Sequence, residues 1–160
     1  MGKKGMSEII TYDNSGNPIN YVGGLTFSWS KGRQLNSATL DNGNTASYNY
    51  NENGLRMYKD TSDTRTTYEW DETKLIIETV TYKQTDNKYD IWYMYDSNDN
   101  VIGFEYSQIS EFDETLKTTR IYYEKNLQGD VIGLLGDRGA ETAAYTYDAC
   151  GNVITDGGKL

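Results

Sequence analysis

Clusters of carboxylates are the residues of this chain with the clearest capacity for chemistry. Glu111, Asp113 and Glu114 form the densest group, and a pair of carboxylates supplies the acid and base of glycoside hydrolysis. The run from Asp96 begins like a calcium-binding loop, but Val101 stands where that loop requires glycine and no glutamate follows at its twelfth position. We therefore interpret the first group as a solvated loop and the second as a turn.

Nucleophiles and metal ligands are scarce. The chain has no histidine and one cysteine, Cys150. The lack of histidine excludes Ser-His and Cys-His catalysis and histidine-bound metals, and one cysteine excludes an intrachain disulfide. Without a histidine to activate it, Cys150 is interpreted as an unreactive thiol in a turn. We expect a protein that is not an enzyme and that has no catalytic residue, metal or cofactor.

Length and charge restrict the class of protein further. The 160 residues suit one domain. The net charge of −9 argues against a nucleic-acid partner, and the short apolar stretches argue against membrane insertion. The first ten residues do not form a secretory signal peptide. We expect a disordered or vector-derived stretch over residues 1–8, a β domain over 9–155 and a flexible tail over 156–160.

A repeated pair of aromatic or apolar residues at positions i and i+2 is the strongest pattern in the chain. Its second members, 17 to 28 residues apart, are Tyr12, Trp29, Tyr50, Trp70, Tyr95, Tyr123 and Tyr147. A polar turn follows each pair, often opened by Asp and closed by Gly three residues later, as in short hairpins with a bulge. The turn residues that we predict to be structural are Asp13, Gly16, Gly54, Asp96, Asp148 and Gly151.

Such repeated hairpins predict an all-β fold. Residues i and i+2 of a strand face the same side, so each pair places two rings on one face. We expect an antiparallel hairpin meander of about 14 short strands with one aromatic face and one polar face. Because an open sheet of that size must bend or split, we expect a strongly curved sheet that forms a partial spiral or shell, or an open barrel.

The aromatic residues leave two interpretations open. Rings at matched positions in every repeat are what a stacked core requires, and this favours a structural role. Exposed aromatic rings on a sheet also bind sugars. Trp92 and its neighbour Tyr93 should point to opposite faces of their strand. Trp92 is therefore the leading candidate for a carbohydrate contact, and Trp29 is a second candidate.

The turn sequences resemble the YD repeat of RHS proteins, in which Tyr-Asp is followed by x-x-Gly-Asn at a period near 20 residues. The similarity covers about residues 9–155. It rests on TYDNSGN (11–17), YNYNENGLR (48–56), YMYDSNDNVIG (93–103), YYEKNLQGDVIGLL (122–135) and YTYDACGNVI (145–154). The last two stretches resemble the region that leads into the RHS repeat-associated core domain.

The resemblance implies a module of a large bacterial protein that is secreted or exposed at the cell surface. In the family such repeats form a β-sheet shell around a toxic segment, which an aspartate-dependent cleavage site releases. No residue here matches that site. We therefore expect a structural repeat module without catalytic activity, with a carbohydrate-binding module as the alternative.

The resemblance and the repeat pattern also suggest partners. Further repeats or a toxin segment of a larger parent chain would lie beside this module, and a glycan is a further candidate. Because unpaired strand edges invite pairing, we expect self-association through the sheet edges, at residues 9–22 and 152–155.

Overall fold

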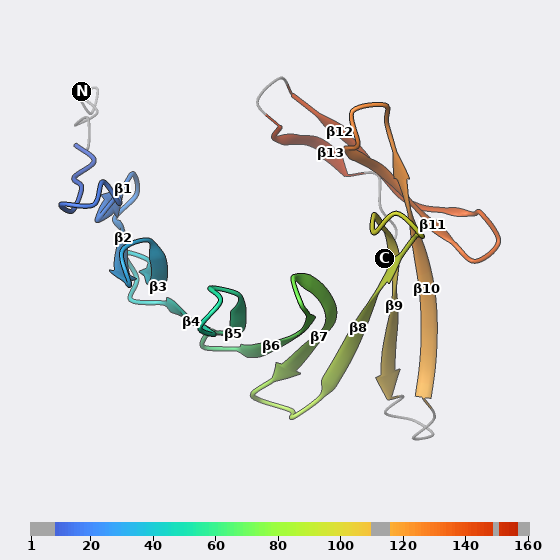
Figure 1. The fold of residues 1–160 in the computed structure, drawn as a ribbon, viewed down its shortest axis with the longest axis horizontal. Coiled ribbons are helices and arrows are strands. Elements are labelled where there is room, and N and C mark those ends of the chain that lie inside the picture. The colour runs from blue at the N-terminus through green and yellow to red at the C-terminus, as the bar shows by residue number, and fades with distance from the viewer. Residues whose placement is uncertain (1–8, 110–115, 149–150, 157–160) are drawn as a thin grey trace, which may run out of the picture. The chain divides into compact units, whose positions relative to one another are not determined.

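Thirteen β-strands make up the described structure, a computed structural model that covers residues 9–109, 116–148 and 151–156. The strands are β1 (Asn20–Tyr21), β2 (Leu25–Ser30), β3 (Gln34–Thr39), β4 (Thr45–Tyr50), β5 (Arg56–Asp60), β6 (Thr64–Asp71), β7 (Lys74–Tyr82), β8 (Lys88–Tyr95), β9 (Val101–Ile109), β10 (Leu116–Lys125), β11 (Val131–Gly136), β12 (Glu141–Tyr147) and β13 (Val153–Asp156). Figure 1 follows them from blue to red along the chain.

The hydrogen-bonded order of the strands is their order in the sequence, from β1 to β13. The predicted all-β class and the predicted antiparallel meander are confirmed, with thirteen strands where about fourteen were expected. Because β1 and β13 stand at opposite ends of this order, the described strands form an open sheet rather than a closed barrel. No helix among the described residues is long and apolar enough to cross a membrane.

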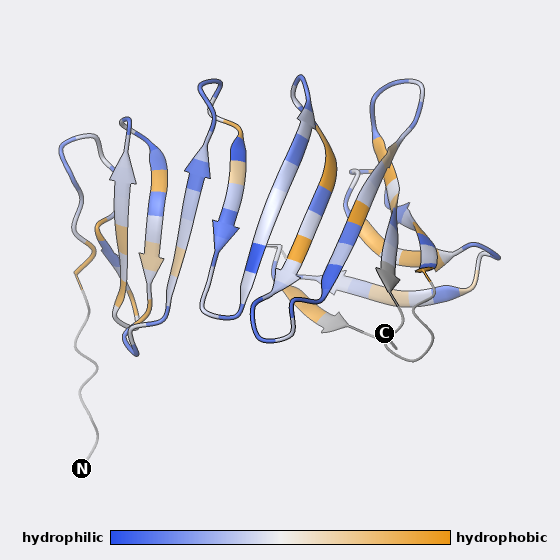
Figure 2. Ribbon diagram, turned by 90° about the horizontal axis from the view of Figure 1, so that it is seen from below, coloured by the Kyte–Doolittle hydropathy of each residue, from blue (hydrophilic) through white to orange (hydrophobic). Residues whose placement is uncertain are grey.

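The chain divides into two compact units. The first holds the residues up to Glu69 together with Val80–Asn87, and the second holds Trp70–Thr79 and the residues from Lys88 onward. Figure 2 shows that most turns are hydrophilic and that the apolar residues lie mainly in short segments of the strands. This distribution follows from the alternation of side chains along a strand, which leaves each turn in solvent.

A small apolar core lies in the second unit. Ile121 on β10, Leu134 on β11 and Ala143 on β12 are the buried apolar side chains among the described residues. Four half-buried residues pack against them: Phe104, Tyr123, Val131 and Tyr145. These residues share one face because Ile121 pairs with Phe104, Tyr123 pairs with Leu134, and Leu134 pairs with Ala143.

The first unit is held together differently. Its buried side chains are polar: Asn17 and Thr66. Asn17 uses its amide to donate to the carbonyl of Gly32, at 2.5 Å, and to the carboxylate of Asp13. Its apolar and aromatic residues stay at least partly accessible, so hydrogen bonds and half-buried rings take a larger share of its stabilisation.

Candidate functional site

Five turns share one hydrogen-bond plan, and they are the most regular feature of the molecule. They span residues 13–17, 51–55, 96–100, 126–130 and 148–152. In each, the side-chain oxygen of the first residue accepts a hydrogen bond from the backbone N–H of the fifth residue, at 2.9 Å. The backbone N–H of the first residue donates to the carbonyl of the fifth, at 2.9 to 3.0 Å. Each turn therefore closes in the same geometry.

The structure places the sequence-predicted turn residues at two positions of this plan. Asp13, Asp96 and Asp148 are first residues, and Gly16, Gly54 and Gly151 are fourth residues. The fourth residue has a positive φ in all five turns, between 65° and 91°. Glycine adopts this conformation without steric cost, and aspartate tolerates it. Asp99 accordingly takes the position of glycine, with φ of 65°.

Sequence reasoning missed two first residues. Asn51 and Asn126 accept the same bonds through their Oδ1 atoms as the three aspartates do. A side-chain oxygen three residues before a glycine was the signal that would have found them. The plan therefore needs an oxygen acceptor at this position and does not need a charge.

Charge nevertheless matters at the aspartates. The side-chain amide of Asn17 donates to Asp13, and this bond, with the backbone N–H of Asn17, holds the pKa of Asp13 below its usual value. Asn100 does the same for Asp96, so the pKa of that carboxyl is lowered too. Hydrogen bonds donated to a carboxylate stabilise its ionised form.

A second hydrogen bond links successive hairpins, and we call it the interhairpin lock. The donor is the side chain of the residue just before a turn. The acceptor is a backbone carbonyl of the preceding hairpin, at the start of the strand that returns from its turn. The donors and acceptors are Trp29 and Pro18 at 2.7 Å, Tyr95 and Leu75 at 2.8 Å, Lys125 and Val101 at 2.6 Å, and Tyr147 and Val131 at 2.6 Å. Three of the four donors, Trp29, Tyr95 and Tyr147, are second residues of the aromatic pairs, and the lock gives their polar groups a partner.

Cations lie among the rings of the predicted aromatic face. The guanidinium of Arg56 lies 4.7 Å from the ring centre of Tyr48 and 5.9 Å from that of Tyr50. Burial acts to lower the pKa of Arg56, but its interactions with Tyr50 and Tyr68 outweigh burial and raise it. On the opposite face, where Tyr58 pairs with Asn49, Arg65 lies over the ring of Tyr58 at 4.6 Å. Cations therefore stack on tyrosine rings on both faces of this part of the sheet.

The two tryptophans that were considered for carbohydrate binding lie in different surroundings. Trp29 is half-buried on β2, its indole N–H is bonded to Pro18, and its ring centre lies 6.2 Å from that of Phe27. Trp92 on β8 is 45% exposed. The polar atoms and ring faces of Trp29 are thus largely used within the first unit, whereas Trp92 offers a ring to solvent.

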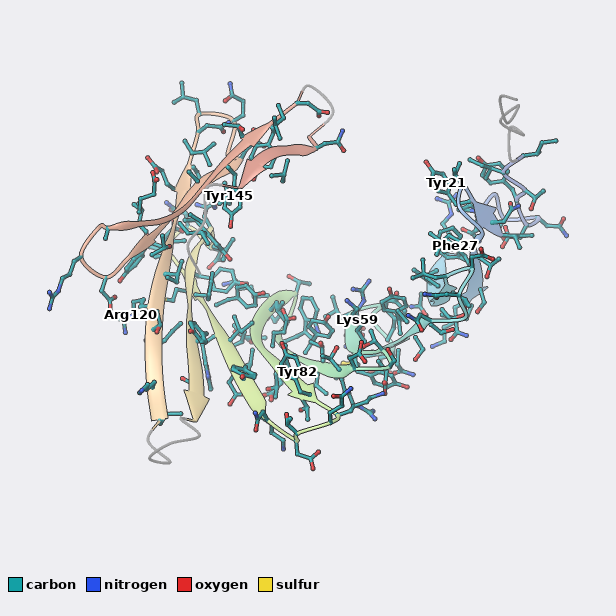
Figure 3. The ribbon with its side chains drawn as sticks, turned by 180° about the vertical axis from the view of Figure 1, so that it is seen from behind. Tyr21, Phe27, Lys59, Tyr82, Arg120 and Tyr145 are labelled. Carbon is teal, nitrogen blue, oxygen red and sulfur yellow. The ribbon has the colours of Figure 1, made fainter. Side chains whose placement is uncertain are left out.

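Trp92 begins a row of exposed and half-buried side chains across three strands of the second unit. It pairs with Glu105 on β9, and Glu105 pairs with Arg120 on β10. Arg120 donates to Glu105 with 2.6 Å between Nη2 and Oε2, and Glu105 together with Tyr122 raises the pKa of Arg120. Figure 3 marks Arg120 on its strand. The row combines a flat ring with a carboxylate and a guanidinium, which together can stack on and hydrogen-bond a polar ligand.

A cavity of about 490 Å³ opens beside the last described turn, lined by Asp130, Val131, Tyr147, Asp148 and Gly151. Its two carboxylates already serve the turns, because Asp130 accepts from Asn126 and Asp148 accepts from Asn152. Within the described ranges, no group of three Asp, Glu or Cys residues is placed to hold a metal ion. The acidic group at Glu111, Asp113 and Glu114 and the thiol of Cys150 lie outside the described residues.

Known proteins resemble the chain in sequence and in fold. No family model matches it. The tRNA3(Ser)-specific nuclease WapA of Bacillus spizizenii is 29% identical over 147 residues, and the tRNA nuclease WapA of Bacillus subtilis strain 168 is 30% identical over 149 residues. The tRNA(Glu)-specific nuclease WapA of Bacillus subtilis subsp. natto is 31% identical over 149 residues. Each match covers 91% of this chain and 6% of the relative.

Two solved structures share the fold. The crystal structure of TcdB2-TccC3-Cdc42 aligns with 91% of this chain and 9% of the matched chain, with a TM-score of 0.57 and 19% identity. The Photorhabdus luminescens Tc holotoxin pore, with a TccC3 variant, aligns with 92% of this chain and 9% of that chain, with a TM-score of 0.55 and 18% identity.

The names of these relatives correct the prediction about enzymatic activity and support the resemblance to RHS/YD-repeat proteins. The prediction that the protein is not an enzyme is wrong, because the three WapA relatives are all named tRNA nucleases. The absence of histidine excludes Ser-His and Cys-His catalysis and histidine-bound metals. It does not exclude enzymes that use other residues, and the prediction ignored these. TccC3 is an RHS/YD-repeat toxin shell, and WapA is an RHS-type nuclease. The repeated turns, the all-β sheet and these similarities are together consistent with an RHS/YD-repeat protein.

Proposed function

We propose that this chain is a β-sheet repeat segment of an RHS-type toxin that is secreted or exposed at the cell surface and that acts on tRNA. The observation that carries the proposal is the single turn plan, repeated five times between Asp13 and Asn152. The similarity to WapA extends over 91% of this chain. Because the chain spans only 6% of each WapA relative, the nuclease activity in their names enters here as part of the proposal.

Within this proposal the segment extends and stiffens a sheet. Five hairpins close through the shared turn plan, and four interhairpin locks tie a hairpin to the preceding one. Stability in such arrays is a sum of local terms and neighbour terms. A module of this kind is suited to form part of a continuous β-sheet whose number of strands grows with the number of repeats.

The test is tRNA cleavage by the polypeptide made from the complete reading frame in which these residues lie. Total tRNA is incubated with that polypeptide and separated by size, and we expect discrete cleavage products. Intact tRNA at every protein concentration, from a polypeptide that circular dichroism shows to be folded, would contradict the proposal. Detection of the polypeptide only inside the producing cells would contradict the secreted or surface location.

A matched pair of variants tests the structural role of the segment. Gly103→Ala forces a methyl group into the backbone of β10, whereas Gly136→Ala meets only ordinary contacts. We expect tRNA cleavage or resistance to proteolysis to fall in the first variant and to be unchanged in the second. Equal behaviour of the two variants would count against a structural role for this sheet.

Carbohydrate binding is the second candidate, and the row of Trp92, Glu105 and Arg120 favours it. We expect Trp92→Ala to remove binding on a glycan array and Trp92→Phe to keep part of it, because phenylalanine retains a flat ring. Trp29→Ala should lower thermal stability, because it removes the bond to Pro18, and should leave binding unchanged. An array on which the unmodified protein binds no glycan would eliminate this candidate.

A further inference from the structure

Asparagine followed by glycine occurs twice in the chain, at Asn42-Gly43 and at Asn53-Gly54. The pair is chemically labile, because glycine has no side chain to shield its backbone nitrogen from the asparagine amide before it. Attack of that nitrogen on the amide carbon forms a cyclic imide. Both asparagines are exposed and stand at the third position of a hairpin turn, so water reaches both sites.

The two turns have the same backbone hydrogen bonds. In turn 40–44, the N–H of Leu40 donates to the carbonyl of Asn44 at 2.8 Å, and the N–H of Gly43 donates to the carbonyl of Leu40 at 2.9 Å. The corresponding distances in turn 51–55 are 2.9 Å and 3.1 Å. Each glycine nitrogen must leave its bond before it attacks, so the backbone slows both reactions in the same way.

The side chain of Asn42 is needed to close its turn. Leu40, at the first position, has no side-chain oxygen. The N–H of Asn44 donates instead to Oδ1 of Asn42, at 2.9 Å. Rotation of the Asn42 amide toward the glycine nitrogen therefore breaks a hydrogen bond of the turn.

The side chain of Asn53 is not needed in this way. Oδ1 of Asn51 accepts the bond from the N–H of Leu55, at 2.9 Å, and a second bond from the N–H of Asn53. Within the described part of the chain, the side-chain amide of Asn53 makes no hydrogen bond. It can therefore rotate toward the nitrogen of Gly54 without loss of a bond.

We propose that Asn53 is a site of spontaneous deamidation in the folded protein and that it reacts faster than Asn42. Hydroxide removes the proton from the backbone nitrogen of Gly54, and this nitrogen bonds to Cγ of Asn53. The side-chain nitrogen takes a proton from water and leaves as ammonia. Water then opens the cyclic imide at either carbonyl. The product is aspartate, or isoaspartate when the main chain continues through the former side-chain carbon.

Deamidation changes the turn in two ways. It adds a negative charge to a chain whose net charge is −9. Isoaspartate also inserts a methylene carbon into the main chain between Asn51 and Leu55, whose bonds close the turn. The next residue, Arg56, begins β5 and lies over the rings of Tyr48 and Tyr50. Isoaspartate therefore loosens the hairpin that carries this cation stack.

Peptide mapping of the folded protein during incubation in mildly alkaline buffer measures both reactions. A protease that cuts after tyrosine separates the two sites at Tyr48 and Tyr50, and mass spectrometry measures the conversion of amide to acid in each peptide. We expect deamidation at Asn53 to be about fivefold faster than at Asn42, the factor that one hydrogen bond of ordinary strength gives. Equal rates, faster reaction at Asn42, or no reaction at Asn53 overturn the proposal.

The same incubation in guanidinium chloride separates the effect of the fold from that of the local sequence. The turns are absent there, and we expect both sites to react at the same rate. A ratio between the two sites that persists in denaturant would overturn the structural cause.

A substitution at Leu40 tests the cause in the folded protein. Leu40→Asn supplies a side-chain oxygen at the first position, as Asn51 does in its own turn, and Leu40 is 49% exposed. We expect the rate at Asn42 to rise to that at Asn53. Leu40→Ala supplies no oxygen and is the matched control, in which the rate at Asn42 should not change. An unchanged rate at Asn42 in Leu40→Asn would overturn the assigned cause.

Thermal melts test the effect of isoaspartate on the hairpin. An isoaspartate-specific methyltransferase, with S-adenosylmethionine as methyl donor, detects isoaspartate in the incubated protein. Asn53→Asp carries the same added charge without the extra main-chain carbon. We expect the melting temperature to be lower for protein that contains isoaspartate than for Asn53→Asp, and equal melting temperatures would overturn the loosening of the hairpin.

Discussion

The side-chain amide of Asn126 donates a hydrogen bond to the carboxylate of Asp130, with 2.9 Å between Nδ2 and Oδ2. At the same two positions of the first turn, the roles are exchanged, and Asn17 donates to Asp13 at 2.8 Å. Both turns therefore hold one amide and one carboxylate in the same place, in opposite order. The geometry of the turn requires a donor facing an acceptor and is indifferent to which residue supplies the charge.

Exchanging the pair at residues 126 and 130 tests this statement. Asn126→Asp alone places two carboxylates against each other, and we expect a lower melting temperature that recovers in part when acid protonates one of them. The double variant with Asp130→Asn rebuilds the arrangement of the first turn, and its melting temperature should return close to that of the unmodified chain. A double variant as unstable as the single one would refute the equivalence.

Stability at low pH should depend on Asp13 and Asp96. The folded state lowers the pKa of both carboxyls from the usual 3.8. A lowered pKa contributes stability that is present above the usual value and is lost as the pH falls through the folded-state value. Thermal melts between about pH 5 and pH 2 should therefore show a falling melting temperature.

Asparagine at these positions should weaken that pH dependence. The turn at Asn51 closes with an amide oxygen in the same place, so Asp13→Asn with Asp96→Asn keeps the backbone bonds of the turns and removes two titrating groups. Each new amide faces the side-chain amide of Asn17 or Asn100, so the melting temperature near neutral pH should fall. We expect a flatter melting curve against pH. Carboxyl resonances of Asp13 or Asp96 that titrate at or above 3.8 in NMR would contradict the proposed cause.

Glycine at residue 103 is required by the closeness of the neighbouring strand. A Cβ atom there would lie 2.1 Å from the carbonyl oxygen of Ile121 and 2.9 Å from the Cα of Tyr122, and both are backbone atoms. Because β9 and β10 would have to separate, we expect Gly103→Ala to cost about 2–4 kcal/mol in chemical denaturation. At Gly136 the nearest atoms lie at 3.7 Å and 3.8 Å, so Gly136→Ala should change the unfolding free energy little.

The small core of the second unit should dominate its resistance to unfolding. Leu134 is buried against Ile121 and Ala143, and truncating it leaves a cavity in addition to the lost apolar contact. We expect Leu134→Ala to lower the unfolding free energy by about 2–5 kcal/mol. Leu127 is fully exposed in turn 126–130, and Leu127→Ala is a control that should leave the denaturation midpoint unchanged.

The parts of this fold that sequence reasoning found are local ones. Aspartate and glycine three residues apart, after a pair of aromatic residues, predict a turn from local sequence, and this places Asp13, Gly16 and their counterparts without any knowledge of neighbouring strands. Paired residues at i and i+2 define the strands in the same way. For this reason the number and kind of strands were close to those observed.

What the sequence did not reveal depends on strand register. The row of Trp92, Glu105 and Arg120 exists because residues 13 and 15 apart along the chain are opposed across the sheet. A bulge shifts the pairing by one residue just before several of the turns, for example between Met94 and Tyr95. The place of Arg56 between two tyrosine rings depends on such a shift, between Asn49 and Tyr50.

The interhairpin lock uses a lysine in one place, and this allows its donor to be tested. Lys125 donates to the carbonyl of Val101 at 2.6 Å, where the other locks use Trp29, Tyr95 and Tyr147. Lys125→Tyr restores the residue type of the other locks and should preserve the unfolding free energy.

Lys125→Met keeps a flexible apolar stem and removes the donor, so the carbonyl loses its bond, at a cost of about 1 kcal/mol. Lys117→Met, at an exposed residue of the same strand, controls for the loss of a positive charge. Equal unfolding free energies for Lys125→Met and Lys117→Met would show that the lock adds nothing to stability. If Lys125→Tyr lowers the unfolding free energy as much as Lys125→Met does, tyrosine and lysine are not interchangeable as donors.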